Sequence, residues 1–239
     1  MTKRLIAFLL AFSPALALAA SGGALQSSQI NPNDTASMQR GAALFMNYCA
    51  GCHSLGFQRY SRMAEDLGLS EEEVMQNLVF TGANYGEPML SAMKPEDGEK
   101  WFGTAPPDLS LVARAKLGGA DWTYTFLKSF YVDESRPSGW NNTVLPGASM
   151  PNVLWEMQGV QRPILDGNGQ VERLEVASAG TQSQAEFDRT VRDLTNFLNY
   201  VAEPSAAKRR SLGVWVILFL SVFTLLAWLL KQEYWKDVH

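Results

Sequence analysis

The chain has 239 residues, with 20 lysines and arginines, 24 aspartates and glutamates, two histidines and two cysteines. Two cysteines cannot form a disulfide framework or a four-cysteine zinc site, so the question becomes what one pair does. Residues 20–207 carry 13 basic and 22 acidic side chains, a formal charge of −9. This charge argues against nucleic acid as a partner and in favour of a basic protein.

The first residues have the pattern of an export signal. Two basic residues precede an apolar run over residues 5–12, and Ala17-Leu18-Ala19 places small residues at the spacing that signal peptidase cleaves. We therefore expect residues 1–19 to be a signal peptide, cleaved next to Ala19 or Ala20. Residues 20–207 then form one exported domain.

Helical periodicity begins soon after this signal. Asp34 or Thr35 is a suitable N-cap for a helix that leads directly to Cys49. Residues 54–105 have a looser pattern, in which we expect a short helix from Ser70 towards Phe80 and otherwise loop. The apolar positions that define the first helix are Met38, Ala42, Phe45 and Tyr48.

The second half of the domain alternates short helices with irregular backbone. A short helix is expected after Pro106-Pro107, ending at Gly118-Gly119, and another from Asp121 through Phe130. Residues 137–151 should be irregular, a small β-hairpin should turn at residues 166–169, and a last amphipathic helix should end before Pro204.

An uncharged stretch near the end predicts a membrane anchor. Residues 212–230 contain no charge, and a helix of this length, at about 1.5 Å per residue, crosses most of a hydrocarbon core of about 30 Å. Trp215 and Trp228 fit the two membrane interfaces better than a buried core helix. We predict a single transmembrane helix over residues 208–231 and a short cytoplasmic tail over residues 232–239.

The charges that flank this anchor conflict with the export signal. Lys208, Arg209 and Arg210 outnumber Lys231 and Lys236, and the positive-inside rule alone would keep the domain in the cytoplasm. Long domains cross membranes largely regardless of their charge, so the export signal decides. The prediction is a periplasmic domain held by one helix in a bacterial inner membrane.

The cysteine pair lies in the sequence Cys49-Ala50-Gly51-Cys52-His53, the C-x-x-C-H pattern that attaches c-type haem. Each thiol can add to one haem vinyl group, and the next residue places an imidazole under the iron. We predict one covalently attached haem c, with Cys49 and Cys52 as anchors and His53 as an iron ligand.

The cysteine pair has three other interpretations. A thioredoxin-like redox pair needs a βαβ context, and a structural zinc site needs two more cysteine or histidine ligands. The helix expected before Cys49 and the histidine count disfavour both. A plain disulfide between Cys49 and Cys52 stays open on this reasoning.

The second axial ligand must be a methionine, or the position is open, because the exported domain contains only His53. Met150 is favoured, since prolines at 146 and 151 stiffen a non-helical loop around it. Met89, which follows Pro88, is the reserve. Met/His ligation favours electron transfer over oxygen chemistry.

With these residues in place, the chain resembles the cytochrome c1 family, the membrane-anchored haem subunits of the cytochrome bc1 complex. The chain departs from the family at Trp101-Phe102-Gly103-Thr104, where the family often has an asparagine, and at Ser149, where glycine is more usual. The matching pieces are Arg40-Gly41, Cys49 to Ser54, Tyr60, Pro106 to Ser110, Arg114-Ala115, Pro146-Gly147, Met150-Pro151 and Ala202-Glu203-Pro204.

This resemblance implies the fold and the site. The fold class is mainly α, a cytochrome c-like haem domain with long loops and a small β-hairpin, followed by the transmembrane helix. By the same comparison His53 and Met150 are the axial ligands, Arg114 pairs with a haem propionate, and Pro107 and Trp122 form walls of the haem pocket.

The resemblance also implies a function. The chain would pass one electron at a time from the Rieske iron-sulfur protein to a soluble cytochrome c, beside cytochrome b in a dimeric complex. It would be a redox subunit and not an enzyme on its own. Two alternatives are a mono-haem subunit of a terminal oxidase or nitric oxide reductase, and a haem peroxidase-like enzyme with an open sixth position.

Overall fold

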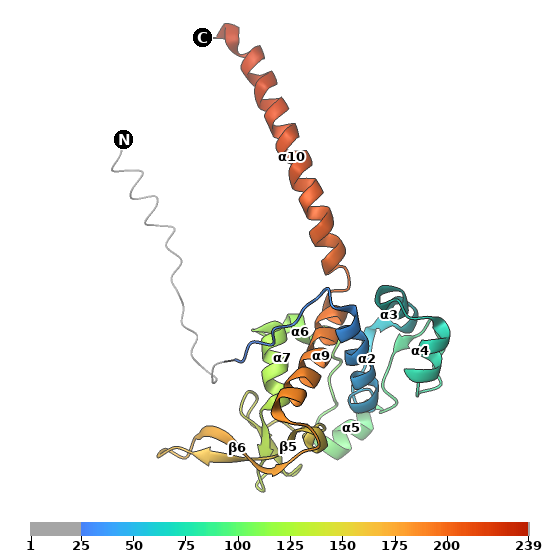
Figure 1. Cartoon of the computed structure of the whole chain (residues 1–239), viewed down its shortest axis with the longest axis vertical. Coiled ribbons are helices and arrows are strands. Elements are labelled where there is room, and N and C mark those ends of the chain that lie inside the picture. The colour runs from blue at the N-terminus through green and yellow to red at the C-terminus, as the bar shows by residue number, and fades with distance from the viewer. Residues whose placement is uncertain (1–24, 239) are drawn as a thin grey trace.

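The computed structural model describes residues 25–238, so the expected signal peptide and His239 lie outside the described residues. The described part is mainly helical, as predicted, with three small antiparallel sheets of two strands each (Figure 1). The helices are α2 (Thr35–Tyr48), α3 (Tyr60–Leu67), α4 (Glu71–Asn77), α5 (Pro95–Phe102), α6 (Val112–Ala115), α7 (Gly119–Lys128), α8 (Trp155–Gln158), α9 (Gln184–Ala202) and α10 (Ala206–Tyr234), with a final 3-10 turn, η1 (Lys236–Val238). The strand pairs are β1 (Leu55–Arg59) with β2 (Pro88–Met89), β3 (Phe130–Val132) with β4 (Trp140–Asn142), and β5 (Gly159–Leu165) with β6 (Val171–Ala179).

The crossing of α2 and α9 forms the centre of the core. Gly41 lies at this crossing, where an added β-carbon would stand 2.6 Å from the Cβ of Phe197. Two polar contacts tie the same helices together, because Asp193 accepts hydrogen bonds from Ser37 Oγ and Arg40 Nε, each at 2.6 Å. These contacts fix α2, the helix that delivers Cys49.

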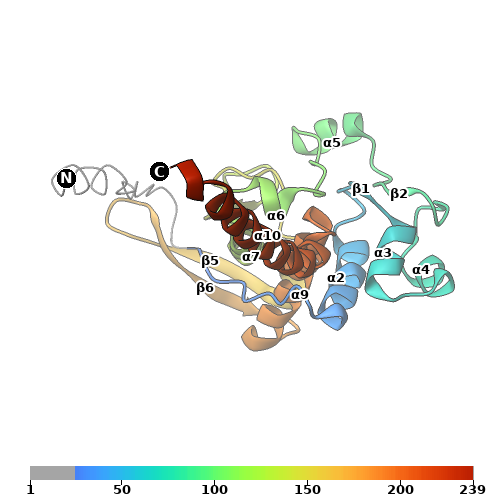
Figure 2. The same cartoon turned by 90° about the horizontal axis from the view of Figure 1, so that it is seen from above.

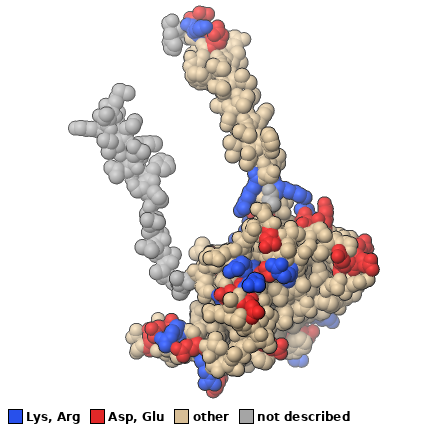
Figure 3. Space-filling model, in the orientation of Figure 1, with Lys and Arg blue, Asp and Glu red and all other residues tan. Residues whose placement is uncertain are grey.

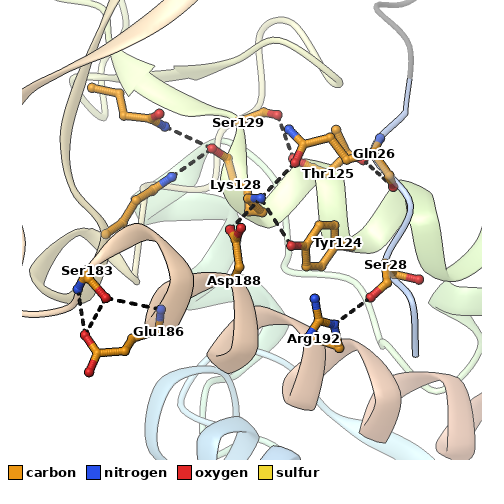
Figure 4. Close-up of polar contacts among 12 residues, drawn as sticks. Gln26, Ser28, Tyr124, Thr125, Lys128, Ser129, Ser183, Glu186, Asp188 and Arg192 are labelled. Atoms are coloured by element: carbon orange, nitrogen blue, oxygen red, sulfur yellow. Dashed lines mark hydrogen bonds and ion pairs between the residues drawn. The ribbon is translucent and has the colours of Figure 1, made fainter. Parts of the chain in front are cut away.

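The segment before α2 fastens α7 to α9. Gln26 N donates to Thr125 Oγ1 at 2.9 Å, and Arg192 Nε donates to Ser28 O at 3.0 Å (Figure 4). Lys128 reaches Asp188 across the same interface at 2.6 Å. The helices α7 and α9 are therefore joined by the start of the described chain as well as by their own packing.

The region between His53 and Pro106 contains more structure than the sequence indicated. Our expectation of loop outside the Ser70 helix was wrong, because β1, α3, β2 and α5 all lie there. The helix from Ser70 is confirmed as α4, with a complete capping box between Ser70 and Glu73. The missed helices are short, but each ends at a glycine in the left-handed conformation, Gly68 and Gly103.

Two boundaries in the second half also differ from expectation. Phe130, expected in a helix, begins β3, because α7 ends at Lys128 and the Ser129 hydroxyl donates back to Thr125 O at 2.6 Å. The short helix α6 ends at Ala115 rather than at the glycine pair. The predicted hairpin is present but longer, since it covers all of β5 and β6.

The anchor expected over residues 208–231 lies within α10, one helix of 29 residues that leaves the domain at the end of α9 (Figure 1). Its candidate span, Lys208–Tyr234, has a mean hydropathy of 2.4, and its apolar window is not buried by the part of the chain that the structure describes. In Figure 3 this helix has an uncharged surface between basic residues at its base and mixed charges at its far end. Such a helix is long and apolar enough to cross a membrane.

Candidate functional site

The cysteine pair lies in a tight turn at the end of α2. The helix ends at Tyr48, and the N–H groups of Cys52 and His53 both donate to Cys49 O, at 3.0 and 2.8 Å. One turn of backbone therefore presents two thiols and an imidazole together. This is the arrangement that the C-x-x-C-H spacing predicts.

His53 is a buried imidazole whose tautomer can be assigned from its partner. Its Nδ1 lies 2.7 Å from the carbonyl oxygen of Pro107, which can only accept, so Nδ1 carries the proton. The lone pair of Nε2 is then free to bind a metal. Burial lowers the pKa of His53 and outweighs the opposing effects of the bond to Pro107 O and of the nearby Asp108. The lowered pKa keeps the ring neutral, as an iron ligand requires.

Both thiols are free, and Cys49 is buried. Burial raises the pKa of Cys49 to about 12, with a smaller contribution from Cys52, and burial also raises the pKa of Cys52. A redox pair of the thioredoxin type depends on a lowered thiol pKa, and these thiols show the opposite shift. Two protonated thiols beside a neutral imidazole fit the donor set of a covalent haem c.

Two neighbouring segments hold the turn from Cys49 to His53, the attachment turn, in place. Leu109 N donates to Ser54 O at 2.9 Å, which ties the segment after Pro107 to the residue after His53. Ser91 Oγ donates to Gly51 O at 2.9 Å, so the end of the β2 hairpin lies along the loop between the cysteines. The position of the imidazole is thus fixed from several directions.

Met150 lies in an irregular loop between β4 and α8, as predicted, and is half-buried. Asparagine side chains brace this loop. The buried Asn142 Oδ1 accepts from the N–H groups of Val144 and Leu145, at 2.8 and 3.1 Å, and Asn142 Nδ2 donates to Phe126 O at 2.8 Å. On its far side, Asn152 Oδ1 accepts from Leu154 N at 3.0 Å.

The remaining predicted site residues lie on α6, on α7 and beside His53. Arg114 is 63% exposed and lies 4.0 Å from Glu203, a long ion pair. Trp122 stacks on Phe126 with ring centroids 5.0 Å apart. Pro107 is exposed and supplies the carbonyl that holds His53. Met89, the reserve ligand, packs in the hydrophobic core.

The structure brings Cys49, Cys52, His53 and Pro107 directly together. Sequence reasoning missed Ser91, which supports the turn of the cysteine pair, and the asparagines that hold the Met150 loop. An asparagine before a proline-rich segment signals a turn, but not which carbonyl its amide will reach.

Comparison with known proteins identifies the family. The model of the "Cytochrome C1 family" matches residues 26–238. The chain belongs to the cytochrome c1 family. A cytochrome c1 of Allochromatium vinosum is 46% identical over the full length of both chains, and a mitochondrial cytochrome c1 of Saccharomyces cerevisiae is 28% identical over 86% of this chain and 68% of that protein. A protein of Nitrosomonas europaea named ammonia monooxygenase gamma subunit is 44% identical over 90% of this chain and 89% of its own length.

Membership in this family confirms the resemblance seen in the sequence. Cytochrome c1 proteins carry a covalently bound haem c, and the chain is an electron-transfer subunit of the cytochrome bc1 complex, a membrane-anchored oxidoreductase. Neither a terminal oxidase subunit nor a peroxidase is favoured. The predicted fold class, cofactor and function are confirmed at this level.

Proposed function

We propose that Cys49 and Cys52 form the thioether bonds to the haem and that His53 and Met150 are its axial ligands. The observation that carries this proposal is the bond from His53 Nδ1 to Pro107 O, because it leaves Nε2 as the free donor beside both thiols. For Met150, the support is a half-buried thioether on a loop held by buried asparagine contacts. When bound, the haem supplies one-electron chemistry between ferric and ferrous iron.

Three further residues shape the pocket in this proposal. Arg114 binds a haem propionate, which is supported by its exposure and by the long, weak pair with Glu203 that it would exchange for a bidentate one. The rings of Pro107 and Trp122 are walls of the pocket. Trp122 is supported in this role by its parallel stacking on Phe126, which keeps its ring in one orientation.

The electron path in this proposal runs through the chain in one direction. The chain accepts one electron at a time from the Rieske iron-sulfur protein and passes it to a soluble cytochrome c, next to cytochrome b in a dimeric complex. The formal charge of −9 over residues 20–207 supports a basic acceptor. The chain by itself turns over no substrate.

The proposed location follows from the order of segments. Residues 1–19 are a signal peptide, residues 20–207 a periplasmic haem domain, residues 208–231 a single span of the inner membrane and residues 232–239 a cytoplasmic tail. The long apolar helix that follows α9 supports the anchor. Protease treatment of intact spheroplasts should remove the haem domain, and protection of the domain would contradict this topology.

A rapid-mixing experiment tests the function. The purified complex is mixed with a ubiquinol, and the haem absorbance is followed before and after addition of a basic soluble cytochrome c. We expect the haem to be reduced through the Rieske protein and reoxidised by the added carrier. A haem that quinol does not reduce, or that instead reacts with peroxide, would contradict the proposal.

A further inference from the structure

A tight turn leads the chain towards Met150. Leu145 O accepts a hydrogen bond from Ala148 N at 3.1 Å, and the glycine between them has a φ of +81°. Proline followed by such a left-handed glycine is the pattern of a type II turn, and here the pair is Pro146-Gly147. Gly147 lies three residues before Met150, so the orientation of this turn limits where the thioether can lie.

Both backbone polar groups of Gly147 are bound by side chains of the β3–β4 hairpin. Its N–H donates to Asn141 Oδ1 at 2.8 Å, and its carbonyl oxygen accepts from Arg136 Nη2 at 2.5 Å. The guanidinium also lies against the turn, since a β-carbon on Gly147 would stand 3.8 Å from Nη2. We call these two contacts the Gly147 clamp. The turn can change its orientation only by breaking them.

The hairpin holds both side chains of the clamp in fixed positions. In the loop between β3 and β4, Arg136 N donates to Asp133 O at 3.0 Å. Pro137 restricts Arg136 further, because proline disfavours the helical conformation in the residue before it. Asp133 Oδ2 accepts from Asn141 Nδ2 at 2.8 Å, which leaves Asn141 Oδ1 as the oxygen that faces Gly147.

We propose that Arg136 and Asn141 are positioning residues, which hold the turn before Met150 so that its thioether stays on the haem iron. Arg136 supplies the stronger contact, because a guanidinium stays protonated and a bond from a charged donor is about twice as strong as one between neutral groups. The clamp acts on the equilibrium between bound and released Met150. Without it, the released state should become more populated. This inference rests on the proposed ligand and deepens it.

Binding of imidazole to the ferric haem of the whole complex measures this equilibrium. Imidazole binds where Met150 has left the iron, so its apparent affinity rises in proportion to the released fraction. Arg136→Leu removes the donor, Arg136→Gln keeps an uncharged one, and Asn141→Ala removes the other half of the clamp. Arg59→Leu is the matched control, because Arg59 Nη1 also donates to a glycine carbonyl, Gly86 O, at 2.5 Å. In Figure 2, β1 and β2 lie on the side of the domain away from the β5–β6 hairpin, beside which β3 packs.

For Arg136→Leu we expect the apparent Kd for imidazole to fall about tenfold, and for Arg136→Gln about threefold, since one charge-assisted bond is lost or weakened. Asn141→Ala should also bind imidazole more tightly than the wild type, and Arg59→Leu should not. A wild-type Kd in Arg136→Leu would overturn the inference; if that variant does not assemble, a wild-type Kd in Asn141→Ala would do so. An equal fall in Arg59→Leu would also overturn it, because general loosening of the domain would then explain the result.

Met150→Ala separates failure of the clamp from failure of the proposed ligand. This variant has no thioether to displace, so it should bind imidazole more tightly than any of the others. If Met150→Ala binds imidazole like the wild type, Met150 is not the ligand, and the ligand and the clamp are both overturned. If Met150→Ala binds more tightly while Arg136→Leu binds like the wild type, only the clamp is overturned.

Discussion

The two sides of the proposed haem site are built differently. On the histidine side, the proposed ligand lies within one turn of the two cysteines, at the end of a helix packed in the core. On the methionine side, Met150 lies in a loop that has no regular structure of its own. Its position depends on side chains such as Asn142 that bond to distant backbone.

This difference predicts how easily each proposed ligand should be displaced. A ligand set by local backbone and helix packing should move only if the whole domain unfolds. A ligand set by a few side-chain hydrogen bonds should be released locally, at a smaller cost in free energy. Four substitutions sharpen this comparison.

The largest expected effect comes from replacing the methionine itself. Met150→Lys should lower the midpoint potential of the haem by on the order of 200 mV, because a thioether ligand raises the potential and axial ligands set it over a wide range. Redox titration of the purified complex measures this. A potential and spectrum that match the wild type would show that another group is the ligand.

Gly41→Ala tests the histidine side through the core. The added methyl group meets the backbone of α9 and the Cβ of Phe197, so we expect the domain to lose about 3 kcal/mol of unfolding free energy. Both axial ligands should be lost together as the domain unfolds. Gly167→Ala, in the turn between β5 and β6, is a control, since a β-carbon there has open space; equal stability of the two variants would contradict the packing argument.

Asn142→Ala tests the methionine side alone. It removes the acceptor for Val144 and Leu145 and the donor to Phe126 O at a buried position, for a loss of about 2 kcal/mol. The methionine-to-iron absorption band should disappear on heating before the far-ultraviolet circular dichroism changes. If both signals are lost at one temperature, the loop is not an independent unit.

The smallest effect is expected for Ser91→Ala, again on the histidine side. The variant loses the exposed hydrogen bond to Gly51 O and the acceptor for Met93 N, for a cost of about 1 kcal/mol. Axial ligation and potential should stay as in the wild type because His53 keeps its bond to Pro107 O. A shift in potential comparable to that of Met150→Lys would show that the histidine side is the less rigid one.

The sequence predicted the long, strongly periodic elements, because burial of one face leaves a repeat of three and four residues. The helices α2 and α9 are of this kind, whereas α10 was predicted from its long uncharged run. It missed α3 and α5, eight residues each, since two turns leave too few apolar positions to establish a period. Pro95 at the start of α5 and the glycine at its end were the available signals.

The residues of the site also differ in how well the sequence predicts them. Cys49, Cys52 and His53 are neighbours in the chain, so their spacing alone predicted the chemistry. The partner of His53, a carbonyl 54 residues away, is a backbone group and leaves no trace in residue type. The asparagines of the Met150 loop act through contacts up to 16 residues distant, which only the folded chain defines.

The most direct test of this account is mass spectrometry of the peptide that contains Cys49, Cys52 and His53, after the purified subunit is denatured in acid and extracted with organic solvent. The account predicts that this peptide carries the added mass of one haem. A peptide with two free thiols or a disulfide, and haem recovered in the solvent, would contradict it.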